Sequence, residues 1–214
     1  MYTIEPHVKH QTIRKGKTKF SCTSYFHPSR LPPEVQEEIV NRLGDRMVKG
    51  EVCLGTTKDA VRQGLQTQLY DAFFFVTNTS LPPGQQDIAT GCFQYADFCR
   101  TGKPHIWITD LCRQMDAHPK PAVSPTTILL RHMETVAKQI GHSDVSLMVD
   151  QSDPTGHSVL TNKVYPSHGF APNTMCVYEG HTIMNKTVNP TPAKLVPKKR
   201  TTRKRKARKT RKHK

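Results

Sequence analysis

The fold is decided by a stretch that begins His105-Ile-Trp-Ile-Thr-Asp-Leu111. This short run of β-branched and aromatic residues predicts a strand. A loop over residues 113–123 follows, and Ser124-Pro125 then predicts a helix start, because serine caps helices and proline is tolerated at the first helical position. Gly141 suits the end of that helix, and Val145-Ser-Leu-Met-Val149 predicts a second strand. A strand, a helix and a strand in this order indicate a parallel βαβ unit.

Upstream of this unit the sequence predicts two helices and two further strands. Pro32-Pro33-Glu34 opens a helical pattern that reaches Met47, and Thr56-Thr57-Lys58-Asp59 is typical of a capped helix start. The predicted strands are residues 71–77 and 88–99, joined by a turn at residues 79–86.

Downstream, Asp153-Pro154 predicts a helix that runs to about Tyr165 and ends by Gly169. Residues 174–178 and 181–188 are expected to pair as a hairpin. The whole order predicts an α/β fold with a mixed sheet of about six or seven strands, flanked by about four helices.

The chain has 214 residues, which fits one domain over residues 1–189 and an extension over residues 190–214. No apolar run approaches the roughly 18 residues that a membrane span needs, and the N-terminus lacks a signal-peptide pattern. We therefore expect an intracellular protein.

The extension carries most of the net charge of +15. Residues 194–214 hold 13 Lys or Arg and no acid, whereas the rest of the chain holds 19 basic and 17 acidic residues. Prolines at positions 190, 192 and 197 predict an extended linker, and the polybasic end beyond it is expected to be disordered. Such a tail binds nucleic acid or another polyanion through phosphates and also suits a nuclear import signal. The expected contacts are Lys198, Lys199, Arg200, Arg203, Lys204, Arg205, Lys206, Arg208, Lys209, Arg211 and Lys212.

The six cysteines show no Cys-x-x-Cys pair, and several lie in apolar runs. They are therefore interpreted as reduced, buried thiols rather than zinc ligands, and no metal is expected. Cys112 stays open as a nucleophile, although packing is the favoured role for it.

Three motifs carry a resemblance to a known family. They are Ile106-Trp-Ile-Thr-Asp-Leu-Cys112, the helix around Leu129-Leu-Arg-His-Met-Glu134, and Val164-Tyr-Pro-Ser-His-Gly-Phe170. Together they resemble the fourth strand, third helix and Leu-Tyr-x-x-x-Gly-Phe motif of the GNAT N-acetyltransferase superfamily. The resemblance covers residues 71–188, and it implies an acetyl-CoA-dependent transfer to an amine.

The resemblance also implies where acetyl-CoA is held. In the family the fourth strand separates from the fifth after a bulge, and pantetheine lies between them. The matching backbone groups here belong to Leu111, Cys112 and Arg113. The pyrophosphate is expected at the amino end of the following helix, where free N–H groups favour anions. The residues there are Ser124, Thr126 and Thr127, with Lys120 and Arg113 nearby.

The loop before this helix departs from the family pattern. The family places glycines here, but residues 118–126 read His-Pro-Lys-Pro-Ala-Val-Ser-Pro-Thr and contain none. Glycine lets the backbone approach phosphate closely, so its absence favours an alternative reading. In that reading the chain is a cofactor-less GNAT-like domain that acts as a nucleic-acid-binding or architectural protein.

Tyr165 is the leading catalytic candidate, because the matching tyrosine in the family often protonates the thiolate leaving group. The competing interpretation is an aromatic residue that packs on the sheet. Asp110 and Thr109 could orient a water or accept the amine proton, although structural roles are the more common ones for such residues. His157 and His168 border the same helix and are interpreted mainly as surface residues.

Overall fold

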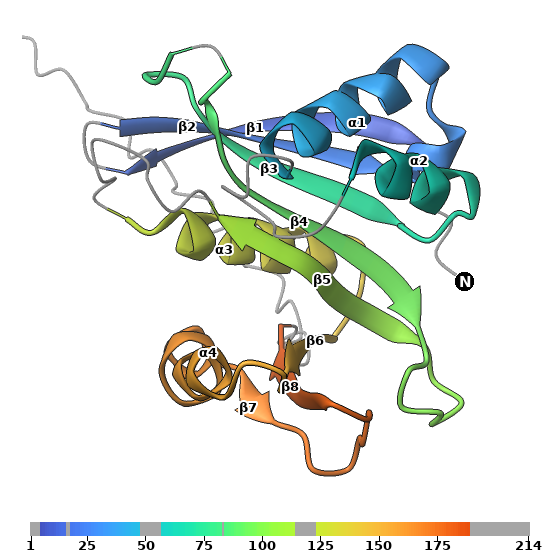
Figure 1. Ribbon diagram of the computed structural model, residues 1–214, viewed down its shortest axis with the longest axis vertical. Coiled ribbons are helices and arrows are strands. Elements are labelled where there is room, and N and C mark those ends of the chain that lie inside the picture. Colours follow the sequence, from blue (N-terminus) through green and yellow to red (C-terminus); the bar gives the residue numbers. More distant parts are fainter. Residues whose placement is uncertain (1–4, 16–17, 48–56, 83, 114–122, 189–214) are drawn as a thin grey trace, which may run out of the picture.

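The computed structural model describes residues 5–15, 18–47, 57–82, 84–113 and 123–188 (Figure 1). The predicted tail at 190–214, and with it the domain boundary near 189, lies outside these ranges. Eight strands form one sheet, in the order β1-β2-β3-β4-β5-β6-β8-β7. They are β1 His7–Lys15, β2 Thr18–Phe26, β3 Ala72–Asn78, β4 Asp87–Ala96, β5 His105–Arg113, β6 Asp144–Asp150, β7 Ala171–Pro172 and β8 His181–Thr187.

Helices cover both faces of this sheet (Figure 1). They are α1 Pro33–Met47, α2 Lys58–Gln66, α3 Pro125–Gln139 and α4 Pro154–Val159; a π-helical segment, Leu160–Val164, and the short α5, Tyr165–Ser167, continue α4. None of the helices in the described ranges is long and apolar enough to cross a bilayer. The fold is thus the predicted mixed α/β architecture, with eight strands rather than six or seven.

The alternation of β3 shows how the two layers form. Phe74 and Val76 join the core cluster under α3, whereas Phe73 and Phe75 join the cluster under α1 and α2. Successive strand residues point to opposite faces, so a strand buried on both sides reads as a continuous apolar run. This is why the stretch 72–76 was recognisable as a strand from sequence.

All neighbouring strands pair antiparallel except β5 and β6, which pair in parallel and are connected by α3. The predicted βαβ unit is therefore confirmed. The predicted helix ends are confirmed as well: Thr57 Oγ1 accepts from Ala60 N at 3.1 Å at the start of α2, and Gly141 takes φ +85° beyond α3.

The hairpin of β1 and β2 was not predicted. β2 alternates buried Phe20 and Cys22 with polar residues, but β1 is an edge strand with only Val8 and Ile13 as large apolar residues. Most of β1 is exposed, so its sequence has too few apolar residues to show the period-2 alternation of a half-buried strand.

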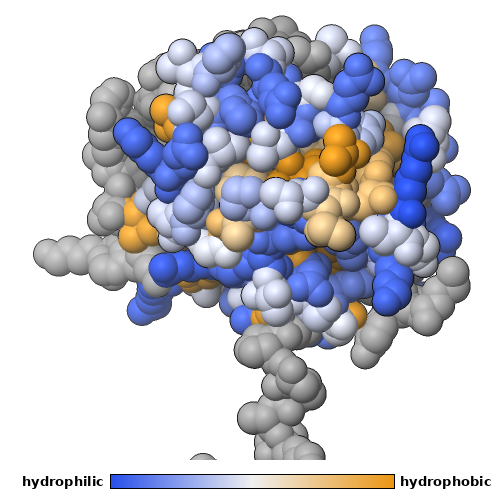
Figure 2. Space-filling model, turned by 90° about the horizontal axis from the view of Figure 1, so that it is seen from below, coloured by the Kyte–Doolittle hydropathy of each residue, from blue (hydrophilic) through white to orange (hydrophobic). Residues whose placement is uncertain are grey.

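The predicted strand at 174–178 is wrong. Only an isolated bridge joins Tyr178 to His181, and β8 pairs instead with β7, where Ala171 opposes Asn185. The side chain of Asn173 accepts from Met175 N at 3.0 Å, which forms a turn where the strand was expected. Met175 and Val177 are 92% and 87% exposed. Figure 2, seen from the side of β7 and β8, shows apolar patches on this otherwise hydrophilic face.

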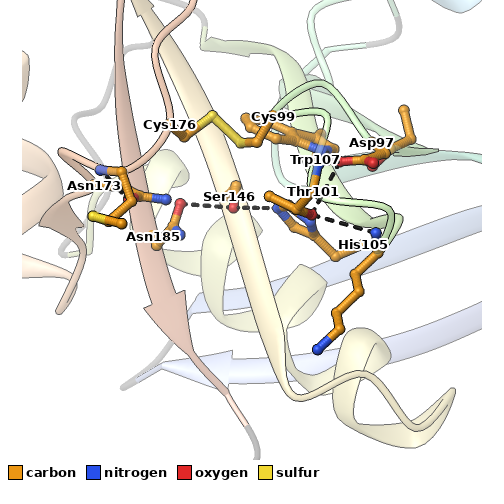
Figure 3. The surroundings of a disulfide bond; sticks show 12 residues. Asp97, Cys99, Thr101, His105, Trp107, Ser146, Asn173, Cys176 and Asn185 are labelled. Atoms are coloured by element: carbon orange, nitrogen blue, oxygen red, sulfur yellow. Dashed lines mark hydrogen bonds between the residues drawn. A yellow bond between two sulfur atoms is a disulfide. The ribbon is translucent and has the colours of Figure 1, made fainter.

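The interpretation of all six cysteines as reduced thiols is also wrong. Cys99 and Cys176 form a disulfide that joins the segment after β4 to the segment before β8 (Figure 3), and Cys112 is disulfide-bonded as well. Cys22 and Cys92 are buried thiols, as predicted. Pairing depends on long-range proximity, which spacing in the sequence does not reveal. Because its sulfur is bonded, Cys112 is not a nucleophile in this state.

Candidate active site

β5 and β6 pair over only part of their length and then separate. They pair only through Ile106, Trp107 and Ile108, although β5 continues to Arg113 and β6 to Asp150. Beyond Ile108, the backbone groups of β5 that point away from β4 therefore pair with no other strand in the described part of the chain. Backbone N–H and C=O groups need hydrogen-bond partners, so this edge can receive a ligand that supplies them.

A bulge accompanies the separation. Thr90 pairs with Cys112 and Cys92 with Thr109, so Gly91 of β4 faces two residues of β5, Asp110 and Leu111. An extra residue bends its strand and increases the local twist, which turns the end of β5 away from the line of β6. The bulge and the separation are the features that the family resemblance predicted.

Gly91 permits this geometry. A Cβ atom there would lie 3.2 Å from Met133 Sδ of α3 and 3.4 Å from Leu111 Cδ1. The backbone of β4 thus approaches α3 closely where β5 bulges, and only a residue without a side chain leaves its neighbours undisturbed. An isolated glycine inside a predicted strand is a known sign of a bulge, so the signal was present in the sequence.

The amino end of α3 has donors to offer. Ser124 is the residue before the helix, as predicted, but its side chain makes no capping hydrogen bond. The first helical bond runs from Ile128 N to Ser124 O, at 3.2 Å. Pro125 has no N–H, so the amides of Thr126 and Thr127 are the donors of the first turn without an intrahelical partner. Such amides, together with the helix dipole, favour an anion.

Tyr165 is buried at the start of α5. The side chain is 8% exposed and packs edge-on against Phe170, with ring centroids 6.1 Å apart. Its hydroxyl makes no hydrogen bond to another described residue, and it is not among the fully enclosed unpaired atoms. Burial raises the pKa of Tyr165 above its ordinary value, so the hydroxyl stays protonated at neutral pH.

A π-helical segment and an ion pair place this tyrosine. Residues 160–164 form the π segment directly before Tyr165, a feature often found at functional sites. After the tyrosine, Lys186 Nζ donates to the His168 carbonyl at 2.6 Å and to Glu134 Oε1 of α3 at 2.7 Å. Glu134 and Lys186 fix the end of α5 against α3, and sequence reasoning missed this pair because its members lie 52 residues apart.

Thr109 lies at the point of separation with its hydroxyl unsatisfied. Among the described side chains, only Thr109 Oγ1 and His132 Nδ1 are fully buried polar atoms without a hydrogen-bond partner. Ile108 faces α3, so Thr109 points to the opposite face of the sheet. An orphaned hydroxyl costs free energy unless a ligand or water meets it, which marks this position as a place for one.

The remaining predicted residues lie on β5, outside the described ranges, or beside β8. Leu111 and Cys112 lie on the separated part of β5, as expected, and so do the backbones of Asp110 and Arg113, whose side chains are not described. Lys120 and most of the glycine-free loop fall in 114–122, outside the described residues. His157 Nε2 lies 2.7 Å from Thr182 Oγ1, a contact that fits a structural role.

A separate hollow of about 420 Å³ lies at the other end of β5 and β6, beside the Cys99–Cys176 disulfide (Figure 3). His105, Lys103 and Asn185 contribute to its lining. It is remote from the separated strand ends and has no part in the arrangement above. Among the described residues, no group of three His, Cys, Asp or Glu side chains is placed to hold a metal ion.

No protein-family model matches the sequence, and no curated protein matches it significantly. Solved structures do resemble it. The GNAT family N-acetyltransferase YhbS from Escherichia coli, in complex with CoA, is 10% identical, with a TM-score of 0.51 over 87% of this chain and 86% of that one. A GNAT family acetyltransferase from Staphylococcus aureus is 10% identical, with a TM-score of 0.49 over 78% and 99%. The likeness to YhbS gives the chain the GNAT fold.

Proposed function

We propose that the protein is an acetyl-CoA-dependent N-acetyltransferase whose reaction centre lies where β5 separates from β6. The observation that carries the proposal is the coincidence of three features: a strand edge without a partner beyond Ile108, the bulge at Asp110 and Leu111, and an uncapped helix start at Ser124. The fold supports the proposal, because it is the fold of a CoA-bound GNAT acetyltransferase.

The residues present fit acetyl-CoA. The backbone groups of Leu111, Cys112 and Arg113 on the edge of β5 that points away from β4 would bond the pantetheine, and the amides of Thr126 and Thr127 would bond the pyrophosphate. The hydroxyls of Ser124, Thr126 and Thr127 can donate to phosphate in place of the missing glycines. When bound, the cofactor supplies an activated acetyl thioester.

Backbone and side-chain groups of this protein then have distinct catalytic roles. A free N–H of β5 is a fixed donor that can stabilise negative charge developing on a carbonyl oxygen, at no cost of reorganisation. Tyr165 Oη holds a proton that it can give to a leaving sulfur, because a phenol is protonated at neutral pH and burial raises the pKa of Tyr165 further. We propose Thr109 and Asp110 as the groups that orient the amine or a water accepting its proton.

The activity is tested by mixing the protein with acetyl-CoA and a panel of primary amines, including peptide N-termini, lysine side chains and polyamines. We expect free CoA thiol to appear with at least one class of acceptor, and acetyl-CoA alone to raise the melting temperature of the protein. No thermal shift at millimolar acetyl-CoA would contradict the proposal.

We further propose that the basic tail directs the protein to nucleic acid. Its charge has no acidic counterpart between residues 194 and 214, so it can release counterions from phosphates. If six phosphates engage, log K should fall against log salt with a slope of about −5. Replacement of Lys204, Arg205 and Lys206 by Gln should reduce that slope, and an unchanged slope would contradict the role.

The same clusters fit a nuclear import signal, and we propose nuclear residence on that ground alone. The disulfide bonds weigh against it, since such bonds persist mainly in oxidising compartments. The alternative of a domain without a cofactor is favoured only by the glycine-free loop, and the acetyl-CoA titration distinguishes the two.

A further inference from the structure

Basic residues gather in the hairpin of β1 and β2 as well as in the tail. Residues 6–33 contain six Lys or Arg and no Asp or Glu, although the chain before residue 194 is almost neutral as a whole. Five of the six lie within residues 9–19, so the positive charge before residue 194 is concentrated in β1, the start of β2 and the residues between them.

Arg14 and Lys19 are the described basic side chains nearest the turn of this hairpin. They lie directly opposite each other on β1 and β2, and both are exposed. Residues that are directly opposed in an antiparallel pair share a face, and like charges in that position are destabilising. Neither side chain has an ion-pair or hydrogen-bond partner within the described parts of the chain.

Protection of the sheet edge explains the residue on β1 better than the residue on β2. Lysines on an edge strand discourage pairing with other chains, and that role would suit Arg14 on β1. Lys19, however, lies on β2, which has β1 and β3 as neighbours, although its pairing with β3 begins one residue later, at Phe20. No contact within the described part of the chain compensates the repulsion between Arg14 and Lys19, and an anion from outside the chain would do so.

The strand register places this pair at the functional end of the sheet. Phe20 pairs with Asn78 of β3, Thr77 with Asp87 of β4, and Ala89 with Arg113 of β5. The tip of the hairpin therefore lies at the edge where β5 and β6 have separated, three strand spacings or about 14 Å from β5. Figure 1 shows the end of β1 and the start of β2 at the same end of the sheet as the arrowhead of β5.

Asp87, an acid at this end of the sheet, is already neutralised. Asp87 receives two hydrogen bonds from Arg42 of α1, from Nε at 2.9 Å and from Nη2 at 2.7 Å. Because both groups are mostly buried, Asp87 does not offset the field of Arg14 and Lys19 at the surface.

We propose that the tip of the β1–β2 hairpin, through Arg14 and Lys19, binds the phosphate backbone of a nucleic-acid duplex beside the transfer site. A narrow basic ribbon without aromatic side chains at its tip suits phosphates rather than unstacked bases. A lipid surface is disfavoured, because Val8 is the one exposed large apolar side chain of the described hairpin. The inference rests on the nucleic-acid partner proposed for the tail, and it adds a second, rigid contact.

The test measures binding of the full chain to a fluorescein-labelled DNA duplex across a salt series. Arg14→Gln/Lys19→Gln is compared with Arg100→Gln/Lys103→Gln, which removes the same charge from exposed residues at the opposite end of the sheet. We expect the hairpin variant to lose about tenfold in affinity and to reduce the steepness of the log K against log salt plot by about 2. The control pair should stay within about twofold of the wild type.

Equal losses in the two variants would overturn the proposal, since a general effect of net charge would then explain both. So would an unchanged hairpin variant when the wild type binds, an outcome that leaves the tail's role intact. A wild type that binds no duplex would overturn both roles, and neither result bears on acetyl-CoA. Matching melting temperatures confirm that the substitutions preserve the fold.

Discussion

Tyr165 combines the two properties that a proton donor needs. Its hydroxyl is protonated at neutral pH, with a pKa that burial raises further, and no described residue engages it in a hydrogen bond. Packing against Phe170 and the contact of Lys186 with the His168 carbonyl hold the ring in place. These contacts involve the ring and the neighbouring backbone rather than the hydroxyl, so the hydroxyl can be removed without disturbing them.

Tyr165→Phe is therefore expected to lower kcat about 10²-fold to 10³-fold, the range typical of general acid catalysis, and to leave the affinity for acetyl-CoA within about twofold. Steady-state kinetics and calorimetry measure the two quantities. Glu134→Gln, which weakens the anchor of Lys186, serves as a comparison in which both stability and turnover should fall. Full activity in the phenylalanine variant would assign Tyr165 to packing alone.

His132 is a residue whose burial makes stability depend on pH. It is 2% exposed, Nε2 lies 2.8 Å from Ser24 Oγ, and Nδ1 has no partner among the described residues. Burial, with a smaller contribution from Lys9, lowers the pKa of His132 to about 4. The unfolded chain takes up this proton near pH 6.5, whereas the folded chain resists it until about pH 4.

The free energy of unfolding should therefore be highest above pH 6.5 and fall by about 3 kcal/mol as the pH drops to 4. Urea denaturation at a series of pH values measures this dependence. His132→Gln should be less stable at neutral pH but flatter between pH 6.5 and 4. Identical slopes in the two proteins would show that other groups cause the acid sensitivity.

At the scale of elements, the bulge between β4 and β5 depends on Gly91. Gly91→Val should reduce the free energy of unfolding by about 1–3 kcal/mol, because the new side chain meets Met133 and Leu111 at close range. Chemical denaturation measures the loss. Combining it with Met133→Ala should cost less than the sum of the two single changes, since the smaller residue makes room. Strict additivity would indicate that Gly91 and α3 are not in contact.

The Cys99–Cys176 disulfide closes a segment of 77 residues and covers Trp107 on the face opposite α3. Cys99→Ser/Cys176→Ser should lower the free energy of unfolding by about 2–4 kcal/mol. Denaturation in urea gives this value, and each single variant should match the double. Alkylation of both thiols in the unreduced wild type, seen by mass spectrometry, would contradict the bond.

Elements with a clear pattern of apolar residues in their own sequence were predictable. Elements whose conformation depends on distant partners were not. β3 reads as a continuous apolar run, and α3 carries Leu129, Met133 and Val136 on its buried face. β1 lacked such a pattern, and the residues around Met175 imitated a strand while pointing to solvent. Their conformation is set by the turn at Asn173 and by the bond from Cys176, neither of which has a local sequence signal.

The candidate site shows the same division. Ser124, Leu111 and Tyr165 were found because they lie in local motifs. The unpaired Thr109 hydroxyl and the Glu134–Lys186 pair follow from contacts between elements far apart in the chain. Gly91 was also missed, but it did have a local signal, since a lone glycine within a strand indicates close approach of the backbone.

Across the whole molecule, one end of the sheet gathers the features that matter for function. The separation of β5 from β6 and the basic tip of the β1–β2 hairpin lie along the same edge, and the amino end of α3 lies beside them (Figure 1). An anionic cofactor and an anionic macromolecule would thus meet on one side of the protein. We propose that the anionic cofactor, acetyl-CoA, is held by the amides at the start of α3.

Calorimetric titration of acetyl-CoA into the wild type, Thr127→Glu and Thr127→Gln tests this claim most directly. Glutamate three residues after Ser124 suits the helix start, so the fold should be kept, but its charge repels a pyrophosphate bound there. We predict one-to-one binding to the wild type and the glutamine variant, and at least tenfold weaker binding to the glutamate variant. Equal affinity for all three proteins, or no binding to the wild type, would contradict the account.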